Sequence, residues 1–318
     1  MTTLQQASHQ WMSRPADERF VSLTALHEFC AEKRRTSRGA VVSSRSLTAM
    51  PIEGDEHGLR ISGPSGVPAD PTNWAFGQLC QRAGARSDYL SKLPAPLTAD
   101  CLNYGLKYMR DVEEIGVLVR ANGGTELAAV TGPNYGRIWN SDVTQALVNR
   151  FGDGITGDFT VPGEFKKKVD VTKANTTLYA SDRDMFVFLA DEKNRIEVPN
   201  RRNGESGSLA RGFFVWNSEV GKTSYGLAMF LFDYVCCNRM VWGAEGYTEI
   251  RGSHTSGAPD RWIEEVAPAI SAYAEASAEP IQRALGAAQR KKIDDVSLFL
   301  LNRFTNSQAL AMQSVHLA

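Results

Sequence analysis

The sequence lacks most of the motifs from which a function can be identified. It has five cysteines, an odd number, with neither a CxxC pair nor a His/Cys cluster of zinc spacing. An adjacent pair such as Cys236 and Cys237 makes a strained disulfide and a poor chelate, which argues against a disulfide scaffold or a zinc module. We expect Cys30, Cys80, Cys101, Cys236 and Cys237 to be reduced thiols.

Net charge and long apolar runs are lacking as well. The 35 basic and 36 acidic residues give a formal charge of -1, which removes any global attraction to nucleic acids or membranes but allows a local basic patch. No stretch approaches the roughly 20 apolar residues of a membrane span, and the N-terminal segment is polar. We expect a cytoplasmic protein without a secretion signal and without a membrane partner.

What is present is an ordinary globular composition. A chain of 318 residues that is 42% hydrophobic can bury a full core, as one elaborate domain or two interlocked ones. The distribution of Gly and Pro predicts three segments. They are an N-terminal helix with a Gly/Pro-rich loop over 1–70, an α+β core over 71–258 and a helical segment over 259–318.

Hydrophobic periodicity predicts an α+β fold in which a central, largely antiparallel sheet packs against helices. Strand-like runs between 159 and 251 are separated by few residues, and such short connections favour an antiparallel meander. Further strands are expected over 59–62, 114–121 and 126–132. Helices are expected over 19–38, 73–93, 96–109, 135–150 and from 259 onward, with a restart at Pro280.

The first predicted helix ends in the densest basic cluster of the N-terminal half. Its members are Lys33, Arg34, Arg35 and Arg38, followed by Gly39. These cations either complement the dipole of a helix that stops at Gly39 or contact phosphate groups. Both interpretations stay open at this point.

Polar residues interrupt the most strand-like stretch, 211–255. They are Asn217, Ser218, Glu219, Asn238, Arg239, Arg251 and His254. In one interpretation they form a bulge and hairpin turns, and therefore a buried polar framework. In the other, Asn217, Glu219, Asn238 and Arg251 meet at one end of the sheet as a polar pocket.

A first hypothesis for function is a nucleic-acid-binding protein, for single-stranded DNA binding or annealing. Such a protein needs cations that follow phosphates and rings on which bases stack. The sequence offers both types of side chain in or near the β region. The candidate contacts are Lys166, Lys167, Lys168, Arg201, Arg202, Arg211, Lys222, Arg239, Arg251, Tyr135 and Trp139, with Arg137 and Trp216 as further members.

A second hypothesis is a metal-dependent phosphodiesterase or nuclease, which would require Mg²⁺ or Mn²⁺; otherwise no cofactor is expected. The candidate catalytic residues are Asp182, Asp184, Glu219 and His254, because hard cations need clustered carboxylates. Asp182 and Asp184 share a face if a strand begins there, whereas the alternative is a turn in which Arg183 pairs with a neighbouring acid.

Four blocks in order resemble a family of phage, prophage and plasmid proteins, defined as a phage/plasmid-like domain of unknown function. The blocks are 75–94, 130–143, 181–191 (SDRDMFVFLAD) and 212–243, and the resemblance covers about 74–304. It implies a mobile-element protein of the bacterial cytoplasm that works in DNA metabolism or against host defence, and it implies no activity. Family members commonly continue beyond the position of Phe304, so we expect that a terminal element is missing here.

The resemblance adds a third hypothesis, an antagonist that binds a host defence protein. Such a protein needs no pocket and instead exposes an apolar patch with a polar rim. The expected partners are therefore a nucleic acid, in first place single-stranded DNA, a second copy of the chain in a homo-oligomer, or a host protein.

Overall fold

The computed structural model describes residues 10, 13–109, 111, 113–121, 123–162, 170–198, 207–233, 241–242, 248–290 and 295–303. The chain divides into two compact units, Met1–Glu275 and Ala276–Ala318. The first unit combines helices with antiparallel sheets, so the predicted α+β class is confirmed. The second unit contains the helices α9 (Glu279–Arg290) and α10 (Val296–Arg303), and the predicted restart near Pro280 is confirmed by the start of α9.

The larger sheet, sheet A, has nine strands in the described chain, all paired in antiparallel fashion. Its central path runs β1-β9-β10-β12-β13-β14, while β8, β11 and β15 pair with β10, β12 and β13. The strands are β1 (Arg19–Phe20), β8 (Phe159–Thr160), β9 (Leu178–Ala180), β10 (Met185–Asp191), β11 (Ile196–Val198), β12 (Gly207–Asn217), β13 (Tyr225–Asp233), β14 (Val241–Trp242) and β15 (Thr248–Gly252). The meander predicted for this region is confirmed in its antiparallel pairing.

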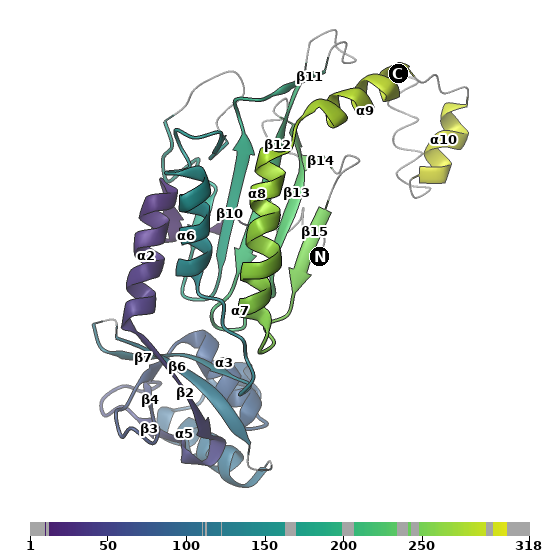
Figure 1. Cartoon of the computed structure of the whole chain (residues 1–318). Helices are drawn as coiled ribbons and strands as arrows, with labels where there is room; N and C mark the ends of the chain where they lie inside the picture. Colours follow the sequence, from purple (N-terminus) through teal and green to yellow (C-terminus); the bar gives the residue numbers. More distant parts are fainter. Residues whose placement is uncertain are drawn as a thin grey trace. The chain divides into compact units, whose positions relative to one another are not determined.

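Helices cover one face of sheet A (Figure 1). Alternate residues such as Phe213, Val215 and Leu227 pack on that side, as period-two alternation requires. The opposite face carries a second buried aromatic cluster that includes Phe214 and Phe230. The covering helices are α2 (Leu23–Thr36), α6 (Asn140–Phe151), and the sequence α7 (Ala258–Arg261), a π-helical turn (Trp262–Val266) and α8 (Ala267–Glu275).

A second sheet, sheet B, has the order β2-β6-β7-β5, with β5 parallel to β7. Together with the hairpin β3–β4 it packs against α3, α4 and α5 around a core that includes Leu79, Leu102 and Ile115. The strands are β2 (Ser37–Ser43), β3 (Thr48–Pro51), β4 (Leu59–Ser62), β5 (Asp70–Pro71), β6 (Glu114–Ala121) and β7 (Thr125–Thr131). The helices are α3 (Asn73–Arg82), α4 (Ser87–Leu90) and α5 (Ala95–Tyr104), and α5 continues as a π-helical turn (Gly105–Met109).

Helix α2 connects the two sheets, and here the sequence prediction was wrong at both ends. Residues 19–20 pair as β1 with β9, and the Ser22 side chain caps the helix by accepting a hydrogen bond from the Ala25 amide. The helix ends at Thr36, and Ser37 starts β2 directly. Gly39 is therefore a strand residue paired with Leu118, not a helix stop. Two short 3-10 helices, Ala16–Glu18 and Ser44–Ser46, flank this region.

Candidate nucleic-acid interface

The loop between β12 and β13 is built from the polar residues that stood out in the sequence. Asn217, Ser218 and Glu219 are buried, and Gly221 has a φ of 82°, a left-handed conformation that suits glycine. The Ser218 hydroxyl donates to the Arg183 carbonyl at 2.6 Å and accepts from the Lys222 amide at 2.9 Å. For Asn217, Ser218 and Glu219, the interpretation as a buried polar framework is confirmed.

The loop is also attached to helix α3. The Val220 carbonyl accepts hydrogen bonds from Trp74 Nε1 at 2.9 Å and from Gln78 Nε2 at 2.8 Å. Gln78 in turn accepts from the Val130 amide of β7 at 2.8 Å. Because one carbonyl receives two side-chain donors from α3, the position of Trp74 is fixed relative to the β12–β13 loop.

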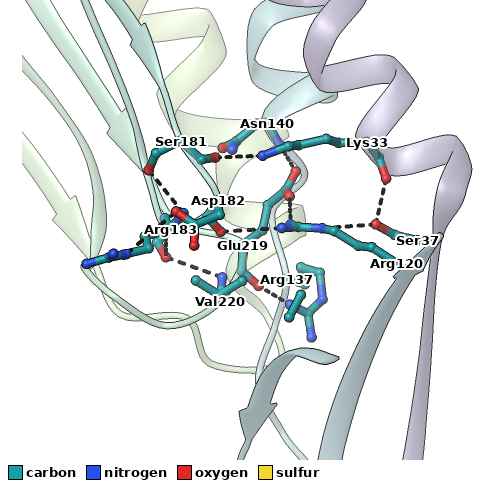
Figure 2. A network of polar contacts seen from close by, with 12 residues as sticks. Lys33, Ser37, Arg120, Arg137, Asn140, Ser181, Asp182, Arg183, Glu219 and Val220 are labelled. Atoms are coloured by element: carbon teal, nitrogen blue, oxygen red, sulfur yellow. Dashed lines mark hydrogen bonds and ion pairs between the residues drawn. The ribbon is translucent and has the colours of Figure 1, made fainter. Parts of the chain in front are cut away.

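A buried ion pair joins this loop to sheet B (Figure 2). Arg120 of β6 and Glu219 are 2.7 Å apart, and their side chains are 4% and 3% exposed. The second Glu219 oxygen accepts from the Asn140 amide at 2.8 Å, so the carboxylate also caps the N-terminus of α6. Arg120 further donates to Ser37 Oγ and to the Asp182 carbonyl, each at 3.3 Å. We call Lys33, Arg120, Arg137 and Glu219 the hub.

The hub contains more cations than anions. Lys33 reaches from α2 to donate to the Ser181 carbonyl at 3.1 Å, and Arg137 donates to the Glu219 carbonyl (Figure 2). Burial lowers the pKa of Lys33, and the nearby Arg120 charge lowers it further. Burial likewise lowers the pKa of Arg137. The Glu219 carboxylate thus lies among one buried and two half-buried cations, which come from β6, α2 and the segment before α6.

Two tryptophans lie over a small buried cluster beside the hub. Trp74 and Trp139 are half-buried, and both pack against a cluster formed by Leu118, Ala128, Ala129 and Val220. The Lys222 ammonium lies 4.8 Å from the Trp74 ring centroid. The Arg34 and Arg137 guanidinium carbons lie 5.5 and 5.7 Å from the Trp139 ring centroid. These distances are typical of cation–π contacts.

A groove of about 430 Å³ between α2 and α6 continues from Arg34. Arg34 forms an ion pair with Asp142, and Arg35 pairs with Glu32 at 2.6 Å. Arg38 donates to backbone carbonyls, and no carboxylate partner for it occurs in the described chain. The groove is lined by His27, Ala31, Arg34, Arg35, Arg38, Ser141, Asp142 and Gln145. We call Trp74, Lys222, Trp139, Arg34 and this groove the ring–cation surface.

The predicted nucleic-acid contacts fall into different environments. Lys222 and Arg251 are exposed, and Arg251 donates to Ser224 Oγ at 2.9 Å. Tyr135 is already engaged, because its hydroxyl donates to the Ser218 carbonyl at 2.7 Å and its ring stacks on His254 at 4.9 Å. Trp216 is 5% exposed and belongs to the sheet core.

The prediction that Arg211 contacts a nucleic acid was wrong, because this residue is 4% exposed and does not reach the surface. Its guanidinium pairs with the buried Asp191 at 2.7 Å and donates to the Tyr273 carbonyl at 3.1 Å. Arg211 therefore joins β10 to α8 inside the fold. Lys166, Lys167, Lys168, Arg201, Arg202, Asn238 and Arg239 lie outside the described residues.

Two of the four predicted catalytic residues, Asp182 and Glu219, lie beside the same Arg120 guanidinium, Asp182 through its backbone carbonyl. Asp182 and Asp184 lie in the turn before β10 and not on a strand, because Ser181 Oγ accepts from the Arg183 and Asp184 amides at 3.0 and 3.2 Å. The turn interpretation is confirmed, including the Arg183–Asp182 pair at 3.6 Å. Asp184 pairs with Arg14 at 2.6 Å.

The Glu219 and His254 side chains both have partners in the folded chain. Glu219 belongs to the hub, and His254 Nδ1 lies 3.1 Å from the Gly136 carbonyl. Burial lowers the pKa of His254. Among the described residues, no three His, Cys, Asp or Glu side chains form a group that could hold a metal ion.

Apolar side chains are exposed in a different part of the first unit, along α5 and the π-helical turn that follows it. Leu97, Tyr104, Tyr108 and Met109 are 53%, 59%, 71% and 62% exposed, and the two tyrosine rings lie 5.3 Å apart. An exposed apolar surface is what the third hypothesis requires, and that hypothesis stays a prediction.

Sequence reasoning missed Arg120 and Trp74. Arg120 ends an apolar strand whose acidic partner is 99 positions away in the chain, and no local pattern links the two. Trp74 lies in the helix predicted over 73–93 and is not among the rings that the sequence analysis selected. The one available signal was the coincidence of Trp74 and Gln78, four residues apart, which places two donors on one helical face.

No protein-family model, curated protein or solved structure matches the chain. The resemblance to phage, prophage and plasmid proteins therefore stays a prediction. In the described residues, no helix has the length and apolar character needed to cross a membrane.

Proposed function

We propose that the protein binds single-stranded nucleic acid through the ring–cation surface, without catalysing a reaction on it. The observation that carries the proposal is the pair of half-buried tryptophans, each with a cation within 6 Å of its ring, on one small cluster. Unpaired bases stack on aromatic rings, and each base–ring contact contributes about 1–3 kcal/mol. The flanking cations would neutralise the phosphates.

The groove between α2 and α6 gives the strand a path away from the rings. Arg34 belongs both to this groove and to the Trp139 contact, so a phosphate backbone that follows Arg38, Arg35 and Arg34 leads to the Trp139 ring. The basic tail of the first predicted helix thus supports the phosphate-contact interpretation, while its last residues form an edge strand. The loop cations at 166–168 and 201–202 remain predicted contacts.

The test is fluorescence anisotropy with a labelled single-stranded oligonucleotide over a salt series, with Mg²⁺ or Mn²⁺ present and the strand checked afterwards for cleavage. We expect intact DNA, affinity that falls steeply with salt, and a loss of about 5- to 150-fold in Trp139→Leu from the stacking term. Arg34→Gln should weaken binding at every salt concentration and flatten the salt dependence.

The matched control for Arg34→Gln is Arg60→Gln. Arg60 is also an exposed arginine in an ion pair with an aspartate. The side chains of Arg60 and Asp70 are 52% and 58% exposed, and those of Arg34 and Asp142 are 45% and 49% exposed. Equal effects of the two substitutions, or wild-type affinity in Trp139→Leu, would reject this surface. Cleavage that depends on the metal would reject the non-catalytic assignment.

A further inference from the structure

A second cavity lies in the part of the first unit built on sheet B, away from the hub and the α2–α6 groove. Its volume is about 410 Å³, within the range of roughly 300–1,000 Å³ typical of pockets for small organic molecules. The β3–β4 hairpin, the start of α3 and the α4–α5 connection line it. The lining residues are Ile52, His57, Gly58, Leu59, Asp70, Pro71, Asn73, Phe76, Leu90, Ser91, Leu93 and Thr98.

The charge of this lining favours a neutral ligand. Asp70 is the only carboxylate among the lining residues, and it is paired with Arg60 at 3.0 Å. No lysine or arginine lines the cavity, in contrast to the groove between α2 and α6. The one arginine next to the lining, Arg60, is already paired with Asp70, so the ligand should be an uncharged molecule that is partly apolar.

The lining also offers a ring and a free carboxamide. Phe76 is half-buried on the wall, so part of its ring is available for a flat partner. Asn73 is exposed, and its side chain makes no hydrogen bond to any residue that the structure describes. A carboxamide both donates and accepts, which matches the adjacent donor and acceptor on the edge of a base such as adenine or uracil in a two-bond contact.

We propose that this cavity binds a nucleobase through the Phe76 ring and the Asn73 carboxamide, with a purine such as adenine preferred because its larger ring system stacks more strongly than that of a pyrimidine. Other lining groups fit the same ligand. The Ser91 hydroxyl is a further polar group, and Leu59 and Leu90 add apolar walls that exclude water from the ring faces. The ligand class is a free nucleoside or an unstacked base of a bound strand.

For a base within a strand, the inference rests on the proposed function. Helix α3 carries both sites, because Trp74 and Gln78 bind the β12–β13 loop while Asn73 and Phe76 line the cavity. A strand stacked on Trp74 could therefore place a neighbouring base in the cavity and gain base preference. For a free nucleoside, the inference stands without the ring–cation surface.

The experiment is equilibrium dialysis of the full chain against adenosine, with uridine as the competing base. We expect saturable adenosine binding with a dissociation constant on the order of 0.1–1 mM, as the size of the ligand allows. Uridine should bind several-fold more weakly. Asn73→Ala should weaken adenosine binding about 5- to 150-fold, the range expected for a two-bond contact to a base.

Matched variants separate this inference from the proposed function. Asn149→Ala removes an exposed asparagine from α6 and should keep full adenosine binding, as should Trp139→Leu. Phe76→Leu keeps an apolar side chain but removes the ring, and it should weaken binding if circular dichroism shows an unchanged fold. No saturable adenosine binding, or binding unchanged in both Asn73→Ala and Phe76→Leu, overturns the inference whether or not single-stranded DNA binds.

Discussion

The hub and the ring–cation surface use the same types of cation in opposite ways. In the hub, Arg120 is 4% exposed and its guanidinium meets a carboxylate at 2.7 Å. On the ring–cation surface, Lys222 is exposed and lies over an indole ring at 4.8 Å. The two regions are linked by one loop, since Glu219 and Lys222 lie three residues apart on it.

The difference shows that the partner and the burial of a cation, rather than its residue type, decide what it does. A buried cation needs a carboxylate or carbonyls, because the cost of removing it from water has to be offset inside the protein. An exposed cation over a ring keeps its hydration on the outer side and stays available to a phosphate. We therefore expect hub substitutions to act on folding and surface substitutions to act on binding.

The largest expected effect is that of Glu219→Gln. The amide keeps the shape of the side chain but removes the negative charge that faces Arg120, Arg137 and Lys33. Breaking a buried pair in this way costs about 3–5 kcal/mol of unfolding free energy. Urea unfolding at neutral pH measures this loss.

The control for Glu219→Gln is Glu113→Gln. Glu113 pairs with Arg82 at 3.0 Å, but the two side chains are 37% and 28% exposed. The loss there should stay below about 1 kcal/mol, as for other solvated pairs. If the two substitutions had similar effects, the Arg120–Glu219 pair would stabilise the fold no more than a surface ion pair does.

A smaller effect on folding is expected when the pH changes the protonation of His254. This side chain contacts the carbonyl of Gly136, the residue before the hub residue Arg137. Its pKa is lowered in the folded state by burial, and its buried Nε2 has no hydrogen-bond partner in the described part of the chain. The unfolded chain therefore takes up the proton first as the pH falls. The contribution of His254 to stability is complete above its ordinary pKa of about 6.5 and is lost as the pH falls below that value.

The matching measurement is urea unfolding at several pH values between 7.5 and 5.5. The protein should lose stability toward the acidic end, and His254→Asn should show a smaller loss over the same interval. His57→Asn, at an exposed histidine, should behave like the wild type. An equally steep loss in His254→Asn would show that other groups cause the acid sensitivity.

Much of the fold could be predicted from the sequence, because its signals are local. The strands at 114–121 and 126–132 and the helical segment from 259 onward follow from periodicity within one element. Strand β2 was missed, since this edge strand exposes most of its side chains and has no alternation to detect.

The candidate site was predicted only in part for the same reason. Lys222, Trp139 and the cluster at 33–38 were recognised by residue type, but their grouping depends on contacts between distant segments. Arg211 shows the reverse error: the sequence marks it as a cation, while the buried Asp191 that neutralises it lies on a neighbouring strand. Pairing across a sheet cannot be derived from either segment alone.

The smallest effect on folding, and the sharpest test of the comparison, is that of Lys222→Gln. Lys222 is exposed and loses only its contact with the Trp74 ring, so the unfolding free energy should change by no more than about 0.5–1 kcal/mol. Its loss should still remove one phosphate contact, which lowers the slope of log affinity against log salt by about 0.7 for a single strand. Lys92→Gln, at an exposed lysine in the α4–α5 connection, should leave both quantities unchanged. A reduced slope in Arg34→Gln with an unchanged slope in Lys222→Gln would confine the strand to Trp139 and the α2–α6 groove. A large loss of stability in Lys222→Gln would instead show that this lysine stabilises the fold as the hub residues do.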